Sequence, residues 1–116
     1  MRQSTQKISV GQKDIREIAG DHFVNINIKV AKTDVAAKLV DGVLSAGILV
    51  DKDGKPANGT TSFGILFEDI DFNNSMGTEI LPVMIHGFVN KSKIEEYSGD
   101  TVTDEAITAL NMIKFL

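Results

Sequence analysis

Three apolar stretches in the middle of the chain decide the expected fold, namely Val43-Leu-Ser-Ala-Gly-Ile-Leu-Val50, Ser62-Phe-Gly-Ile-Leu-Phe-Glu-Asp-Ile-Asp-Phe72 and Leu81-Pro-Val-Met-Ile-His-Gly-Phe-Val-Asn90. Their content of Val, Ile and Phe favours β-strands, and the Asp-Gly pair at 53–54 predicts a hairpin between the first two. Pro82 cannot donate a hydrogen bond to a sheet, so we expect it at a strand start or edge. The pattern predicts a mainly β fold, a small α+β domain with one or two short helices.

Further elements are expected on both sides of these stretches. Apolar and polar residues alternate from Val24 to Val30, which predicts a half-buried strand. Residues 35–40 fit helical spacing without deciding the matter, and Asp41-Gly42 ends them in a turn. Thr103 is followed by two acidic residues, which favours the start of a short helix. The apolar residues 112–116 should be tied into a sheet or packed against a neighbour, because a dangling apolar end invites aggregation.

The first 20 residues are polar and irregular, and we expect them to form a flexible N-terminal arm before a single β-rich domain at residues 21–116. Ile8 and Val10 are spaced as in a strand. Ile15 and Ile18 share one side of a possible helical turn, since Asp14-Ile-Arg-Glu17 has the form of a capping box. We expect these four isoleucine and valine residues to bind a partner surface, with the arm becoming ordered on docking and contributing nothing to the core.

Composition narrows the classes of function. At 116 residues the chain is expected to form one domain, and its lack of cysteine excludes disulfides, thiolate zinc sites and thiol nucleophiles. A formal net charge of −4 argues against a nucleic-acid partner, because binding to phosphates normally requires a basic patch. No stretch approaches the roughly 20 apolar residues of a membrane span, so no membrane partner is expected.

Acidic clusters offer two candidate metal sites, and neither has the pattern that such a site requires. Asp51 to Gly54 begins like a calcium loop, but Ser62 stands where a bidentate Glu is needed. Asp69 and Asp71 would share a strand face about 7 Å apart, which could suit a divalent ion or an acid/base pair. Both residues belong to an expected exposed strand end, so we interpret them as a solvated strand end rather than a site.

Other residue types that carry chemistry are equally isolated. His22 and His86 are the only histidines, whereas a zinc site needs three or four ligands. Ser62 is misplaced by one position for a nucleophile elbow, and no helix is expected after it. We therefore expect no catalytic residue, no cofactor and no bound metal.

The order of three phrases resembles the head decoration proteins of lambda-type phages. The phrases are Ala46-Gly-x-Leu-Val-x-x-x-Gly-Lys55, Gly64-Ile-Leu-x-Glu-Asp-Ile-Asp71 and Val83-Met-Ile-His-Gly-Phe-Val-Asn90, followed by a short helix and an apolar end. The resemblance covers roughly residues 24–116 and is one of fold pattern, since it includes no catalytic signature. The charged arm departs from the family, in which the arm is typically rich in Pro, Thr and Ala.

The resemblance implies a β-clip or β-tulip-like fold and a non-enzymatic role in the virion. The family forms homotrimers on the outside of the capsid, where they bind three-fold positions of the expanded lattice of the major capsid protein and stabilise it. Assembly would take place in the cytoplasm of the bacterial host. The apolar C-terminal segment then supplies candidate trimer contacts, namely Met112, Ile113, Phe115 and Leu116.

Two alternatives remain from the sequence. A tail or fibre component of a phage would also be a trimeric structural protein. A lipoyl-like carrier or ligand-binding β module is suggested by Lys52, which stands between Asp51 and Asp53 in an expected hairpin, although the chain lacks the second, quasi-repeated half of such carriers.

Overall fold

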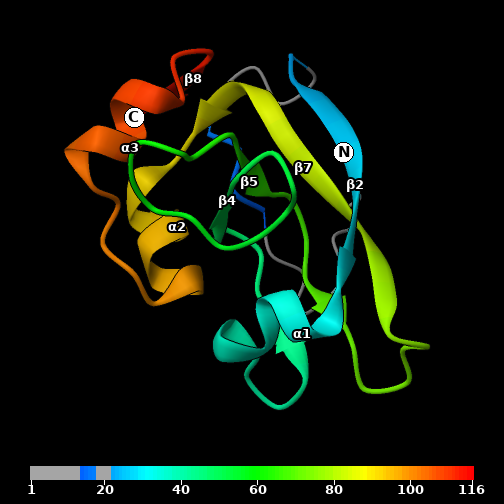
Figure 1. The fold of residues 1–116 in the computed structure, drawn as a ribbon. Helices are drawn as coiled ribbons and strands as arrows, with labels where there is room; N and C mark the ends of the chain where they lie inside the picture. Colours follow the sequence, from blue (N-terminus) through cyan, green and yellow to red (C-terminus); the bar gives the residue numbers. More distant parts are fainter. Residues whose placement is uncertain (1–13, 18–21) are drawn as a thin grey trace, which may run out of the picture.

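The computed structural model describes residues 14–17 and 22–116, and its main sheet is centred on one long strand, β7 (Thr78–Val89) (Figure 1). β2 (Val24–Ala31) pairs antiparallel with one side of β7, and β5 (Gly64–Leu66) pairs antiparallel with the other. β4 (Leu49–Val50) extends the sheet beyond β5, while β8 (Ile113–Phe115) runs parallel to the end of β7. The protein is mainly β with short helices, so the predicted fold class is confirmed.

The helices lie in two places. α1 (Lys32–Val35) and the 3-10 helix η1 (Ala36–Lys38) follow β2 at the lower end of Figure 1. α2 (Lys91–Ser98) and α3 (Asp104–Ala109) fill the crossover from β7 to β8, on the side of β7 away from β2. Thr103 caps α3, since its Oγ1 accepts the N–H of Ala106 as the sequence predicts. No helix in the described part of the chain is long and apolar enough to cross a membrane.

β7 contributes to two different hydrophobic cores. Leu81 and Val83 join the first core, which β2, α1 and the strands before β7 enclose. Met84 and Val89 join the second core, which lies against α2, α3 and β8. One strand therefore holds both clusters together, with Leu81, Val83, Met84 and Val89 buried.

The first two predicted strands exist, but each is broken in the middle. β3 (Val43–Leu44) pairs with β6 (Ile70–Asp71), and β4 pairs with β5, so the two breaks face each other across a bent hairpin. The bend has two causes. Gly47 has a positive φ of 93°, and the N–H of Ala46 donates to the Asp69 carboxylate at 2.8 Å instead of to a neighbouring strand.

The prediction that Pro82 lies at a strand start or edge is wrong, because Pro82 lies inside the central strand. Its carbonyl accepts the N–H of Phe67, just beyond the end of β5. The nitrogen of a strand residue points to the same side as its carbonyl, so the missing N–H of Pro82 faces away from β2. No hydrogen bond of the long β2–β7 ladder is lost.

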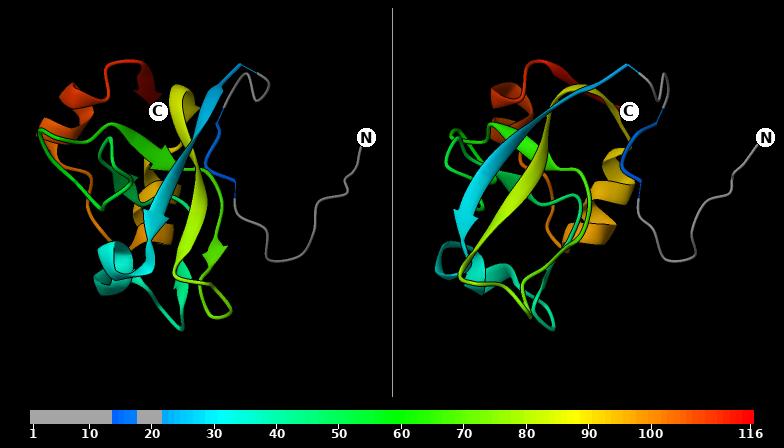
Figure 2. Two further views of the ribbon diagram at one scale, coloured as in Figure 1. Left: turned by 45° about the vertical axis from the view of Figure 1, so that its right-hand side comes forward. Right: turned by 90° about the vertical axis from the view of Figure 1, so that its right-hand side faces the viewer.

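Residues 14–17 pack against the body, contrary to the expectation that the first 20 residues contribute nothing to the core. Ile15 is fully buried in the second core. Arg16 forms an antiparallel bridge with Val89, and Ile15 accepts the N–H of Asn90. The segment is extended rather than helical, and Figure 2 shows it in dark blue beside the junction of β7 and α2. Ile8, Val10 and Ile18 lie outside the described residues.

An arginine holds this segment in place. The Arg16 guanidinium lies 5.2 Å from the ring centre of Phe23 and 5.4 Å from that of Phe67, and the two rings stack. Arg16 also pairs with Asp14 at 2.8 Å. Burial acts to raise the pKa of the Asp14 carboxyl, but hydrogen bonds from Arg16 and its charge outweigh burial and lower that pKa. The ionised Asp14 carboxylate therefore contributes to stability above the ordinary carboxyl range, and its contribution is lost as the pH falls through the lowered pKa.

The close packing around Gly64 predicts that alanine substitution there and at Gly59 will have very different effects on stability. A Cβ atom on Gly64 would collide with Val83 and would lie 2.8 Å from the carbonyl oxygen of Met84, whereas a Cβ atom on Gly59 would meet nothing within 4 Å. We expect Gly64→Ala to lower the free energy of unfolding by about 1–3 kcal/mol or more, because β5 must move away from β7. Gly59→Ala is the matched control and should lie within about 0.5 kcal/mol of the wild type in urea denaturation. Equal stability of the two variants would contradict the described packing.

Candidate interaction surface

The outer face of the sheet at the end of β7 carries a group of exposed and half-buried apolar and aromatic side chains. Along β7, His86 and Phe88 alternate with the buried Gly87 and Val89. Register extends this face onto the neighbouring strands, because Val24 pairs with His86 and Lys114 pairs with Phe88. We call this surface the β8 face and define it as Val24, His86, Phe88, Met112, Lys114 and Leu116.

Three apolar side chains of the β8 face are well exposed: Val24 at 47%, Met112 at 60% and Leu116 at 48%. Between β7 and β8 lies a shallow depression of about 190 Å³, lined by His86, Phe88, Met112 and Lys114 among others. Contiguous apolar side chains with a polar rim are typical of a surface that binds another protein. The chemistry that this face offers is apolar contact with one positive charge, that of Lys114.

The candidate trimer contacts divide between this face and the interior. Met112 and Leu116 lie on the β8 face. Ile113 is only 6% exposed and belongs to the second core, and Phe115 packs against that core. These two side chains fill their own subunit because β8 pairs with β7 and turns alternate residues inwards. The C-terminal segment is thus tied into a sheet, one of the two outcomes that the sequence predicted.

The two histidines meet at the edge of the β8 face, although 63 residues separate them in sequence. Nε2 of His22 lies 3.1 Å from Nε2 of His86, and the His22 ring centre lies 5.9 Å from that of Phe88. Nδ1 of His86 is buried without a hydrogen-bond partner. Sequence reasoning treated the histidines separately, because only the pairing of β2 with β7 brings them together.

The acidic candidates have structural partners. Asp69 accepts the N–H of Ala46, and Asp71 accepts both the backbone and the side-chain N–H of Asn73. Asp51 accepts the backbone N–H groups of Asp53 and Lys55 and so closes a turn. Within residues 14–17 and 22–116, no three His, Asp or Glu side chains converge as metal ligands would.

Ser62 and Lys52 lie in the loop between β4 and β5. Ser62 is buried, its hydroxyl donates to the carbonyl of Ala57, and it accepts the N–H of Gly59. That hydroxyl therefore closes the loop, and both of its hydrogen-bond partners are backbone groups rather than the base that a nucleophile requires. Lys52 is exposed at the tip of the turn, where a modified lysine would be accessible.

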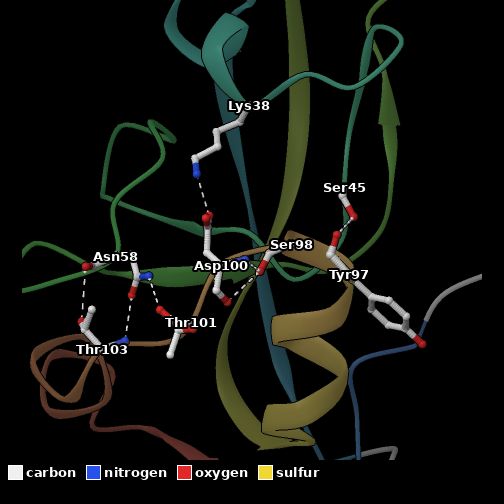
Figure 3. A network of polar contacts seen from close by, with 8 residues as sticks. All are labelled: Lys38, Ser45, Asn58, Tyr97, Ser98, Asp100, Thr101 and Thr103. Atoms are coloured by element: carbon white, nitrogen blue, oxygen red, sulfur yellow. Dashed lines mark hydrogen bonds and ion pairs between the residues drawn. The ribbon is translucent and has the colours of Figure 1, made fainter.

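A cleft of about 290 Å³ separates η1 and the β4–β5 loop from the connection between α2 and α3. Figure 3 shows that polar contacts span it: Lys38 pairs with Asp100 at 2.6 Å, and Ser98 accepts the N–H of Asp100. The Asn58 amide donates to the carbonyl of Thr101 and accepts the N–H of Thr103. We call Lys38, Asn58, Ser98, Asp100, Thr101 and Thr103 the seam network. Its polar groups bind one another, which favours a structural role over ligand binding.

No family model, curated protein or solved structure matches the chain. The functional interpretation therefore depends on the surfaces of the protein itself and on the resemblance in the sequence.

The seam network predicts a measurable cost for losing Asn58. Asn58→Ala removes both side-chain hydrogen bonds to the α2–α3 connection, and we expect it to lower the free energy of unfolding by about 1–2 kcal/mol. Asn74→Ala, at an exposed position in the loop before β7, is the matched control and should change stability by less than about 0.5 kcal/mol. Thermal or urea unfolding of both variants provides the measurement. A neutral Asn58→Ala would show that the seam network does not stabilise the fold.

Proposed function

We propose that the protein is a phage head decoration protein that binds the expanded capsid as a trimer at three-fold positions and stabilises it. The β-clip-like class of the fold is part of this proposal. Its chemistry is binding rather than catalysis, since the acidic and hydroxyl side chains considered above have structural partners. A protein that binds only the assembled, expanded lattice raises the stability of that lattice by linkage.

The β8 face is the single observation that carries the proposal. A cyclic trimer needs an exposed patch on each subunit that fits a different patch of its neighbour. Val24, Met112 and Leu116 supply apolar area of this kind, and β7 and β8 hold it on a sheet rather than on a loop. Such a surface gains free energy when it is removed from water.

The three phrases of the resemblance also support the proposal, because they coincide with the features that shape the fold. The first contains the bend at Gly47 and the turn at Gly54, both with positive φ. The second contains Gly64, which allows β5 to approach β7, and Asp69, which accepts the Ala46 N–H. The third is the half of β7 that pairs with β8. The resemblance in sequence therefore falls on residues that shape this fold.

Negative charges introduced on the β8 face test whether this face forms the trimer interface. We expect Met112→Glu and Leu116→Glu each to weaken self-association by at least about tenfold, because burial of an unpaired carboxylate is costly. Val40→Glu, at an apolar position that is 70% exposed near α1, is the matched control. Sedimentation equilibrium of the free protein and of protein bound to capsids gives the readout. A wild-type protein that is monomeric in both states would contradict the trimer.

The N-terminal residues provide a second test of the proposal. The deletion must end before Ile15, because Ile15 is buried in the second core. We propose that residues 1–13, with Ile8 and Val10, bind the capsid by adding a strand to a sheet edge of the major capsid protein. Deletion of residues 1–13 should leave the melting temperature nearly unchanged and abolish binding to expanded heads. Ile15→Ala should instead lower the free energy of unfolding by about 2–4 kcal/mol, because a buried side chain is lost.

Binding to purified heads and purified tails of the same phage separates the alternatives. Occupancy on expanded heads that survives the deletion would disprove the role of residues 1–13. Binding to tails but not to heads would replace the head decoration protein by a tail or fibre component.

A further inference from the structure

The pair of histidines at the edge of the β8 face has the geometry of a chelate. We propose that His22 and His86 bind one divalent transition-metal ion, of the class that prefers imidazole nitrogen, through their Nε2 atoms. This site goes beyond the proposed function, and its test does not depend on capsid binding. It revises the expectation from the sequence that the chain holds no metal.

The separation of the two nitrogen atoms fits a shared ion. The Nε2 atoms lie 3.1 Å apart. Zinc–imidazole bonds measure about 2.0–2.1 Å, so two nitrogens at this separation subtend an angle of roughly 100° at the metal, between the octahedral and tetrahedral values. His86 is fixed on the long strand β7, while His22 precedes β2 at an exposed position and can rotate its ring toward the ion.

The tautomer that a metal requires places a ring proton at a buried atom of His86. A metal on Nε2 of His86 places the ring proton on Nδ1, which then needs an acceptor. Nδ1 of His86 and Oδ1 of Asn25 are both buried without hydrogen-bond partners, and the irregular register between Val24 and Asn25 lies opposite His86. No hydrogen bond joins these two atoms, so the Asn25 side chain would have to move before Oδ1 could accept a proton carried by Nδ1.

The surrounding residues determine which metals the site prefers and how tightly it binds them. No carboxylate among the described residues completes a three-ligand cluster here, so calcium and magnesium, which require oxygen ligands, are disfavoured. Zinc, nickel and copper ions accept imidazole and can fill their remaining positions with water. Lys114 lines the same depression as His86, and its positive charge opposes a cation. We therefore expect an exchangeable site rather than a structural one.

Titration of the full chain with Zn²⁺ or Ni²⁺ alone tests the proposal. Calorimetry should show one ion bound per chain, with a rise in melting temperature that Mg²⁺ does not produce. His22→Asn and His86→Asn should each weaken binding at least about tenfold, since each removes one of two ligands. Lys114→Gln should leave the site intact and strengthen binding, because it removes the nearby positive charge.

Three outcomes would overturn the proposal. One is the absence of Zn²⁺ and Ni²⁺ binding to the wild type, which would leave the pair as an ordinary N–H···N hydrogen bond. Another is unchanged affinity in His22→Asn, a variant at an exposed position that does not depend on repacking of the strand. The third is equal binding of Mg²⁺, which would point to oxygen ligands elsewhere.

Discussion

β7 is the constraint on which the rest of the structure depends, because it contributes buried residues to two different cores. Leu81 and Val83 contribute to the core near α1, and Met84 and Val89 contribute to the core under α2 and α3. Every other strand of the main sheet except β4 pairs with β7 directly. A change that shifted β7 by one residue would exchange its two faces and expose both cores at once.

The same constraint explains why small residues matter so much around β7. Gly64 brings β5 against Val83 and Met84, closer than any side chain would allow. Pro82 is tolerated in a central strand only because its nitrogen faces the space beyond the end of β5. Residues 14–17 then occupy the edge of β7 that β2 leaves free after His86, so the strand is paired on both sides almost to its end.

The sequence predicted the elements whose signals are local. The alternation from Val24 to Val30, the turn at Asp41-Gly42 and the cap at Thr103 each depend on neighbouring residues, and each is present. The sequence did not predict the features that depend on a residue distant in the chain. The bend at Ala46 needs the Asp69 carboxylate, 23 residues away, and the burial of Ile15 needs the end of β7. The capping-box pattern at Asp14–Glu17 predicts the start of a helix, and it carries no information about the edge of β7 to which this segment adds.

The candidate surface was predicted in part for the same reason. Met112 and Leu116 stood out as apolar residues near the chain end, but inward-facing and outward-facing positions cannot be told apart without the pairing of β8 with β7. The meeting of His22 with His86 also follows from strand register, which short-range spacing does not specify. Histidine content alone gave no signal, since two such residues distant in sequence are ordinarily unrelated.

The seam network also affects the rate at which Asn58 deamidates. Asn58 precedes Gly59, and an Asn-Gly pair deamidates readily when the glycine nitrogen can attack the side-chain carbonyl. Here the Gly59 N–H donates to Ser62, and Thr101 and Thr103 hold the Asn58 amide by hydrogen bonds. While the seam network is intact, the Gly59 nitrogen therefore cannot reach the side-chain carbonyl of Asn58 in the geometry that the attack requires. Conversion to aspartate would replace a donor to the Thr101 carbonyl by a negative charge. Isoaspartate at position 58 would therefore record how often the seam opens during the lifetime of the protein.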